Sequence, residues 1–257
     1  MTMATVAVLG LGEAGSRLAA DLVAAGLAVR GYDPDATIDV QVPTRALDPE
    51  TAVTGSDVVL SVNAAAAALD AARAALTALS RDTIYADLNT ASPQLKREVA
   101  ELVAGVGARF ADVALLAPVP ARGLSTPALA SGAGARAFAD VFGPLGMPVE
   151  VISARAGDAA TLKLLRSVFM KGLAAAAIES LRAAEVAGHA DWLERELSGV
   201  IGRPLLERLL EGSRKHAARR VDEMEAARDV LLELGIEPRI AAASASLLAE
   251  LAAAEAR

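Results

Sequence analysis

The stretch from Thr5 to Asp33 constrains the fold more than any other part of this sequence. Residues 5–9 form a short apolar run, and the segment Gly-Leu-Gly-Glu-Ala-Gly at 10–15 follows without a spacer. Residues 16–25 carry apolar side chains at helical spacing, and residues 28–32 read as a second strand. The order of strand, glycine turn, helix, strand and acid predicts a βαβ unit in a parallel sheet.

Each glycine of this turn has a separate expected role in binding a dinucleotide. Gly10 permits the tight turn, Gly12 lets a pyrophosphate approach the backbone, and Gly15 lets the helix pack closely on the sheet. The helix start offers free N–H groups and a positive dipole end to the phosphates. The alternative, a glycine turn that merely packs, leaves the acid after the second strand unexplained. The candidates for cofactor binding are Gly10, Leu11, Gly12, Glu13, Ala14, Gly15, Tyr32 and Asp33.

Asp33 bears on the choice of cofactor. A carboxylate at this place accepts hydrogen bonds from ribose hydroxyls and repels a 2′-phosphate. We therefore expect NAD. NADP is the alternative, since a nearby arginine can offset the repulsion.

Strands and helices alternate through the rest of the first half of the chain. Strands are expected at 57–62, 83–88, 109–116 and 149–152, an edge strand at 126–132, and helices at 64–79, 93–103 and 133–142. This alternation predicts an α/β fold with a doubly wound parallel sheet. Ligands of such sheets lie at the carboxyl ends of the strands, so we expect Asn63, Asn89 and Thr90 to contact the dinucleotide. The alternative is ordinary turn chemistry.

A proline-rich segment, 117–123, follows the strand at 109–116. A rigid loop at a strand end suits the wall of a substrate pocket, and the alternative is a plain connection. The candidates for substrate binding in this loop are Pro118, Val119, Pro120 and Arg122.

A long helical pattern runs from 159 to 187, and Asp158 is its expected cap. Lys163, Ser167 and Lys171 are spaced by four and therefore share one face of this helix. Polar groups are costly to bury without a purpose. A lysine here can donate a proton to a carbonyl oxygen as a hydride arrives, and can take the alcohol proton in the reverse direction. The alternative is that the lysines lie on a solvated face.

Glycines divide the last part of the chain into expected helices at 192–197, 203–211, 213–234 and 238–254. The patterns predict two domains, 1–156 with the sheet and 157–257 all-helical. His216 and Arg220 lie four residues apart and are candidates for binding an anionic substrate, and the alternative is a solvated face with internal ion pairs. The second domain is too small to bury its long helices by itself, so we expect a homodimer.

Composition excludes several classes of function. The net charge of −7 offers no basic stripe for nucleic acid. The absence of cysteine excludes disulfides, thiolate zinc sites and a cysteine nucleophile. No histidine and carboxylate cluster has metal-ligand spacing, so no metal is expected. There is neither a signal-peptide pattern nor an apolar run of about 18 residues, and a cytoplasmic enzyme without a membrane span is expected.

The chain resembles the β-hydroxyacid dehydrogenase superfamily, which includes 6-phosphogluconate and 3-hydroxyisobutyrate dehydrogenases. The resemblance rests on the glycine turn with its acid, on Asp-Leu-Asn-Thr-Ala-Ser-Pro at 87–93, on 112–123, and on 157–163. It implies a Rossmann domain, a smaller all-α domain reached through a long interdomain helix, and NAD(P)-dependent hydride transfer between nicotinamide and a small hydroxy or keto acid. Lys163 matches the family's catalytic lysine, a general acid and base.

Two departures from the family pattern affect the expected substrate site. The family's Ser-Gly-Gly, which holds the substrate carboxylate, is replaced by Pro120, Ala121 and Arg122, and the family's asparagine is Ser167. The segment 163–172 is similar to a branch with an uncharacterised C-terminal domain, so the substrate is not inherited from the named enzymes. The alternatives are an imine reductase-like enzyme, against which Lys163 argues, and a non-catalytic dinucleotide-binding regulator.

Overall fold

One sheet of eight strands forms in the part of the chain that the computed structural model describes, residues 4–35 and 44–255. The strands are β1 (Thr5–Leu9), β2 (Ala28–Tyr32), β3 (Thr44–Arg45), β4 (Val58–Ser61), β5 (Ile84–Asp87), β6 (Arg109–Leu115), β7 (Ala128–Ser131) and β8 (Val149–Ser153). Their order is β3-β2-β1-β4-β5-β6-β7-β8. Residues 1–3, 36–43 and 256–257, which the two predicted domains include, lie outside the described residues.

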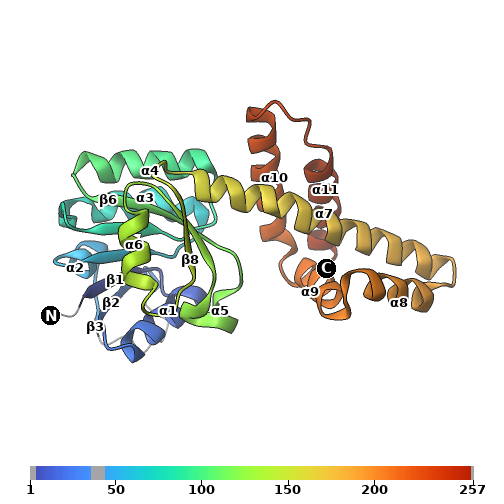
Figure 1. The fold of residues 1–257 in the computed structure, drawn as a ribbon, viewed down its shortest axis with the longest axis horizontal. Helices are drawn as coiled ribbons and strands as arrows, with labels where there is room; N and C mark the ends of the chain where they lie inside the picture. Colours follow the sequence, from blue (N-terminus) through green and yellow to red (C-terminus); the bar gives the residue numbers. More distant parts are fainter. Residues whose placement is uncertain (1–3, 36–43, 256–257) are drawn as a thin grey trace. The chain divides into compact units, whose positions relative to one another are not determined.

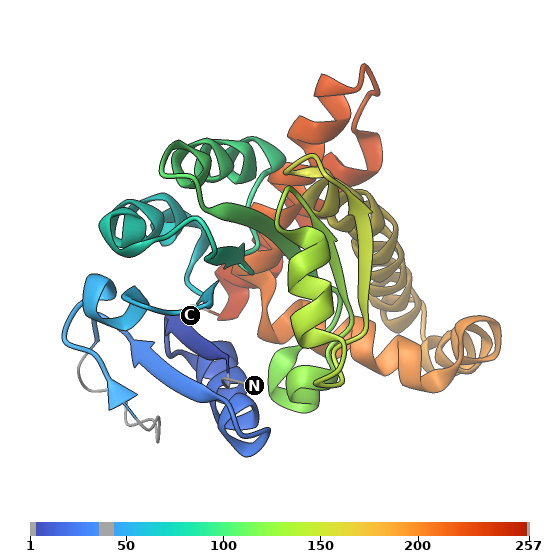
Figure 2. The ribbon, with the colours of Figure 1, turned by 60° about the vertical axis from the view of Figure 1, so that its left-hand side comes forward.

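Helices cover both faces of this sheet, which confirms the doubly wound α/β architecture (Figures 1 and 2). Side chains of α1 (Glu13–Ala24) and α6 (Ala135–Phe142) share one apolar cluster with the sheet. Side chains of α2 (Pro49–Val53), α3 (Ala68–Ala75) and α4 (Pro93–Gly105) share another, formed by the alternate residues of the same strands. A sheet covered on both faces explains why β4 and β5 are buried along their whole length.

In the sheet-containing part of the chain, two of the expected elements differ from the sequence prediction. The segment 126–132 was expected at the sheet edge, and this was wrong: β7 lies between β6, to which it is antiparallel, and β8. An antiparallel neighbour needs only a short connection, and the proline-rich segment supplies it with α5 (Val119–Arg122) and the 3-10 turn η3 (Gly123–Ser125). The helix expected at 64–79 is α3 flanked by the 3-10 turns η1 (Ala65–Ala67) and η2 (Leu76–Ala78).

The chain divides into two compact units between Lys163 and Leu164. This point lies within α7 (Asp158–Val186), which therefore belongs to both units. The predicted domain boundary after residue 156 lies just before this helix and stays a prediction.

The second unit is all-helical, with α8 (Ala190–Ile201), α9 (Arg203–Lys215), α10 (Ala217–Glu233) and α11 (Arg239–Glu255) after α7. Its core contains Leu164, Met224 and Leu248. The break that the sequence placed at Gly212 lies instead at His216. Gly212 remains inside α9, where a Cβ atom would overlap the guanidinium of Arg220, so this glycine makes room for a side chain. In the described part of the chain, no helix is both long and apolar enough to cross a membrane.

Candidate functional site

In the glycine turn between β1 and α1, two glycines are packed against other atoms of the protein and one has free space around it. Gly10 has a φ of 97°, and a Cβ there would lie 2.7 Å from Oδ1 of Asn63. A Cβ on Gly15 would overlap the carbonyl oxygen of Gly10. Around Gly12, by contrast, a Cβ would meet nothing within 4 Å, and no side chain caps the start of α1 there. An exposed glycine beside uncapped helix N–H groups fits the pyrophosphate of a dinucleotide.

Asp33 holds this turn in place. Its Oδ2 accepts a hydrogen bond of 2.6 Å from the N–H of Leu11, and its Oδ1 accepts one of 2.9 Å from the N–H of Asp35. An ionised carboxylate has about four acceptor positions, so capacity remains for ribose hydroxyls. Among the other cofactor candidates, Glu13 is exposed, whereas Ala14 and Tyr32 are half-buried.

The asparagines expected at the strand ends link β4 to β5. The N–H of Asn63 donates to Oδ1 of Asn89, and both amide groups donate to the hydroxyl of Ser61 at 3.0 Å. Asn63 also lies beside Gly10, because its Oδ1 limits the space there. These two residues therefore connect the glycine turn to the end of β5.

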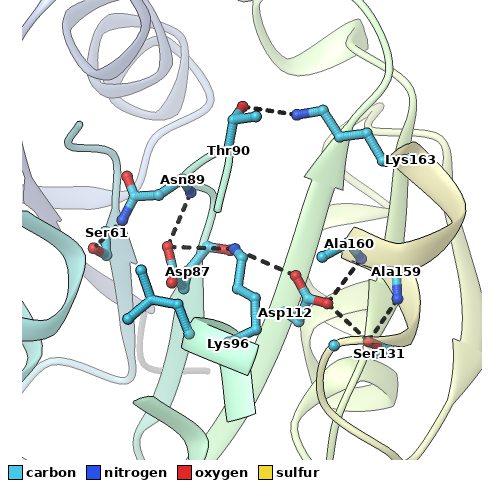
Figure 3. A network of polar contacts seen from close by, with 12 residues as sticks. Ser61, Asp87, Asn89, Thr90, Lys96, Asp112, Ser131, Ala159, Ala160 and Lys163 are labelled. Carbon is cyan, nitrogen blue, oxygen red and sulfur yellow. Dashed lines mark hydrogen bonds and ion pairs between the residues drawn. The ribbon is translucent and has the colours of Figure 1, made fainter. Parts of the chain in front are cut away.

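Lys163 lies at the same edge of the sheet. Its Nζ donates a hydrogen bond of 2.8 Å to the hydroxyl of Thr90, which is exposed directly after Asn89 (Figure 3). Lys163 itself is half-buried in the second turn of α7. The structure thus brings together Thr90 and Lys163, which are 73 residues apart in the sequence.

A buried ion cluster beneath this contact was missed by sequence reasoning. The ammonium of Lys96, 1% exposed, donates to the carbonyl of Asp87 at 2.7 Å and lies 3.3 Å from Oδ1 of Asp112 (Figure 3). Burial raises the pKa of Asp87, although Lys96 opposes the shift. One signal existed in the sequence: Lys96 shares the apolar stripe of α4 with Val99 and Val103, at spacings of three and four.

Asp112 and Ser131 accept hydrogen bonds from the N–H groups in the first turn of α7, a capping role that the sequence predicted for Asp158. The N–H of Ala160 donates to Oδ2 of Asp112, and the N–H of Ala159 donates to the hydroxyl of Ser131, both at 3.0 Å. Asp158 instead accepts hydrogen bonds from Ser153 and Arg155. No sequence signal pointed to Ser131, because a serine at the end of a strand is common.

The loop expected to bind substrate is fixed to the cofactor helix α1. Arg17 donates to the carbonyl of Pro120 at 2.9 Å, and Asp21 accepts from the N–H of Leu124 at 2.9 Å. A Cβ on Gly123 would overlap the Asp21 carboxylate, which explains the glycine. The side chain of Val119 is buried in the core, so the exposed candidates of this loop are Pro118, Pro120 and Arg122.

Ser167 and Lys171 meet at Glu223 within the helical unit. The hydroxyl of Ser167 donates to Oε1 of Glu223, and Nζ of Lys171 lies 2.9 Å from the same oxygen. Burial lowers the pKa of Lys171, an effect that Glu223 opposes and the nearby Arg220 reinforces.

Arg220 belongs to the same region of the helical unit. Its Nη1 donates a hydrogen bond of 2.7 Å to the hydroxyl of Ser213, and burial lowers the pKa of the guanidinium. His216, half-buried, stands between α9 and α10. Among the described residues, no group of three or more His, Asp or Glu side chains is arranged to hold a metal ion.

Two family descriptions match parts of the chain. Residues 5–119 match the NAD binding domain of 6-phosphogluconate dehydrogenase. Residues 184–251 match a domain of unknown function, DUF1932.

Similar proteins cover most or all of the chain. The conserved protein MTH1747, described as of unknown function with structural similarity to 3-hydroxyacid dehydrogenases, is 30% identical over 98% of both chains, with a TM-score of 0.77. An uncharacterised 28.5 kDa protein of Methanothermus fervidus is 29% identical over 74% of both chains. The 3-hydroxyisobutyrate dehydrogenase of Mycobacterium tuberculosis shares the fold, with a TM-score of 0.82 and 22% identity over 98% of this chain and 94% of that one.

Proposed function

We propose that this chain, which belongs to the β-hydroxyacid dehydrogenase superfamily, is an NAD(P)-dependent oxidoreductase. It joins a 6-phosphogluconate-dehydrogenase-type NAD-binding domain to a DUF1932 domain. Its substrate is a small hydroxy acid or the corresponding keto acid. The fold and the dinucleotide-binding domain belong to the family, while the reaction and its substrate class are our proposal.

One row of contacts along the carboxyl edge of the sheet carries this proposal. Asn63 lies beside Gly10 in the glycine turn, Asn89 accepts from Asn63, and Thr90 accepts from Lys163. The row follows the strand order β1-β4-β5. A dinucleotide bound at the glycine turn of such a sheet extends across the strand ends. An amine at the far end of the row is therefore suited to act beside its reactive ring.

Lys163 supplies the proton chemistry in this proposal. The nicotinamide, when bound, supplies or accepts a hydride. The ammonium of Lys163 donates a proton to the carbonyl oxygen of the substrate during reduction, and the neutral amine takes the proton of the alcohol during oxidation. Thr90 orients the amine by accepting one of its hydrogen bonds.

The positively charged side chains of the helical unit favour the proposal that the substrate is an anion. Lys171 and Arg220 bring two positive charges to a partly buried region in which Glu223 supplies one negative charge. Ser167 and His216 add groups that form hydrogen bonds. Within the helical unit, we propose that four residues, Ser167, Lys171, His216 and Arg220, hold an anionic group of the substrate. Arg122, in the first unit, is a separate candidate for binding an anion.

NAD is the proposed cofactor because Asp33 stands at the end of β2 with its carboxylate on the glycine turn. This charge repels a 2′-phosphate. Fluorescence titration should therefore give a lower Kd for NADH than for NADPH. Failure of both cofactors to bind would contradict the whole proposal.

The experiment for the reaction compares Lys163→Ala with the wild type across a panel of hydroxy and keto acids, with NADH absorbance as the signal. Loss of the general acid and base should lower kcat by at least about 100-fold. The affinity for NADH should change little, because Lys163 has no part in the glycine turn. Lys215→Ala, which removes an exposed lysine of α9, is the matched control. An active wild type whose Lys163→Ala variant keeps the full rate would show that the lysine is assigned wrongly.

A further inference from the structure

Lys96 places a buried ammonium beneath the contact between Lys163 and Thr90. Its side chain is 1% exposed and lies between the carboxylates of Asp87 and Asp112, which are equally buried (Figure 3). We propose that Lys96 is a positioning residue: through Asp87 it fixes the turn that carries Thr90, and through Asp112 it fixes the first turn of α7, which carries Lys163. The role assigned to Lys163 in the reaction rests on the proposed function, whereas the positioning itself does not.

Two sets of contacts, which we call arms, lead away from Lys96. The first arm runs through β5. Lys96 Nζ donates to the carbonyl of Asp87 at 2.7 Å and lies 3.5 Å from Oδ1 of the same residue. That Oδ1 accepts a hydrogen bond of 2.9 Å from the N–H of Asn89. Thr90 is the next residue, so the ammonium and the carboxylate together set the direction in which the chain leaves β5.

The second arm runs through β6 and β7. Lys96 Nζ lies 3.3 Å from Oδ1 of Asp112, while Oδ2 accepts from the N–H of Ala160 and from the hydroxyl of Ser131. The same hydroxyl accepts from the N–H of Ala159. The first turn of α7 is thereby held on the end of the sheet, and Lys163 follows Ala160 by less than one helical turn.

The side chain of Lys96 contacts both arms, since its Nζ lies within ion-pair distance of Asp87 and of Asp112 (Figure 3). A cation is the group that this place requires, because two buried carboxyl groups without one repel each other and resist ionisation. Within the described part of the chain, Oδ2 of Asp87 and Oδ1 of Asp112 have no hydrogen-bond partner, and the ammonium of Lys96 lies within ion-pair distance of both carboxyl groups. An apolar residue at 96 would fill the space and leave both arms without their common anchor.

Selective labelling makes the position of Lys163 measurable without substrate or cofactor. The chain contains four lysines, at 96, 163, 171 and 215, so a protein labelled with ¹³C and ¹⁵N in lysine gives a spectrum with few side-chain amine signals. Replacing each lysine in turn removes one signal and thereby assigns it. Thr90→Ala gives the position of the Lys163 signal when its hydrogen bond to the Thr90 hydroxyl is missing.

We expect Lys96→Met to move the Lys163 signal toward its position in Thr90→Ala, with the signals of Lys171 and Lys215 unchanged. Ser131→Ala removes one acceptor of the second arm only, and it should move the Lys163 signal in the same direction by a smaller amount. Lys215→Met is the control, and it should change no signal except its own. In a turnover assay, Lys96→Met should lower kcat at least about tenfold, since the geometry of the catalytic groups is disturbed.

A folded Lys96→Met protein in which the Lys163 signal keeps its wild-type position would overturn the proposal. If Lys96→Met does not fold, Ser131→Ala decides: an unchanged Lys163 signal in that variant overturns the proposal equally, and a moved one supports it. A wild type without any turnover would contradict the proposed function, but the spectra would still decide the positioning role.

Discussion

The three glycines of the turn after β1 differ in what surrounds them. A Cβ on Gly15 would meet backbone of Gly10, whereas a Cβ on Gly12 would meet nothing within 4 Å. Gly15 is therefore required by the protein itself, and Gly12 leaves space for a ligand. This difference gives a test that separates folding from cofactor binding.

We predict that Gly12→Ala melts at the wild-type temperature and binds NADH at least about tenfold more weakly, a loss of about 1.4 kcal/mol. The methyl group occupies space that the pyrophosphate needs. Gly15→Ala should be destabilised by about 1–3 kcal/mol, because the chain must move to relieve the overlap. Thermal unfolding and NADH titration measure both effects. A Gly12→Ala protein that binds NADH as the wild type does would show that no phosphate lies at Gly12.

Asp87 should make the stability of the protein depend on pH. Burial raises the pKa of this carboxyl above its ordinary value, so the folded state binds the proton more tightly than the unfolded state, which loses it from about pH 4 upward. The free energy of unfolding then falls as the pH rises from the unfolded-state pKa to the folded-state pKa. The fall is about 1.4 kcal/mol for each pH unit between these two pKa values.

We predict that Asp87→Asn removes this dependence. The amide oxygen of the new asparagine can still accept the hydrogen bond from the N–H of Asn89, and Lys96 keeps its ion pair with the carboxylate of Asp112. Urea unfolding at a series of pH values from about 4 upward should show the variant gaining stability relative to the wild type as the pH rises. Asp70→Asn, at an exposed carboxylate, should follow the wild type. Equal pH slopes for Asp87→Asn and the wild type would contradict the prediction.

The connection of α5 and η3 is an element that sequence patterns described only as a rigid loop. Pro118 and Pro120 are not what attaches it, because Arg17 and Asp21 of α1 supply the hydrogen bonds that hold it. The same helix begins at the glycine turn. The candidate substrate loop at 117–123 and the glycine turn therefore share one support, the helix α1.

We predict that Asp21→Ala frees this connection. The N–H of Leu124 loses its acceptor and Arg17 loses its ion-pair partner, so amide hydrogen exchange in a peptide covering 118–126 should become at least about tenfold faster. Asp70→Ala breaks a comparable but exposed ion pair with Arg73 and is the matched control. Unchanged exchange in Asp21→Ala would mean that the prolines alone hold the loop.

At the scale of the whole molecule, the helical unit exposes large apolar side chains along α7 and α8. Val186 is 92% exposed, Trp192 57% and Val200 79%. Ala187 and Trp192 help to line a hollow of about 570 Å³ between these helices. Exposed apolar surface of this kind is typical of sites that bind a partner, and we propose that a second copy of the chain is this partner.

We predict that the wild type is a dimer by light scattering and that Ala187→Glu is a monomer at the same concentration, because the charge would be buried in the interface. Leu232→Glu is the control. It places a charge at a comparably exposed apolar residue of α10, away from the hollow, and should remain a dimer. A monomeric wild type would contradict the expected homodimer.

The βαβ unit, the glycine turn and the candidate lysine could be predicted because the residues that determine each of them lie close together in the sequence. Periodicity and turn residues act over neighbouring positions, so β1, β2 and the position of Lys163 in a long helix required no tertiary information. Errors arose where a distant side chain or strand set the outcome. Gly212 lies inside α9, where it makes room for Arg220, and β7 is an interior strand because β8 pairs with it.

Local sequence patterns were thus enough for the doubly wound sheet, the dinucleotide turn and the lysine of α7. The surroundings of that lysine depend on the folded chain. Thr90, Lys96, Asp112 and Ser131 come from separate elements, and the hydrogen bond from Ala160 to Asp112 spans 48 residues of sequence. Such partners are set by strand order and helix packing, which bring distant segments to one edge of the sheet, and no local pattern records which side chains meet there.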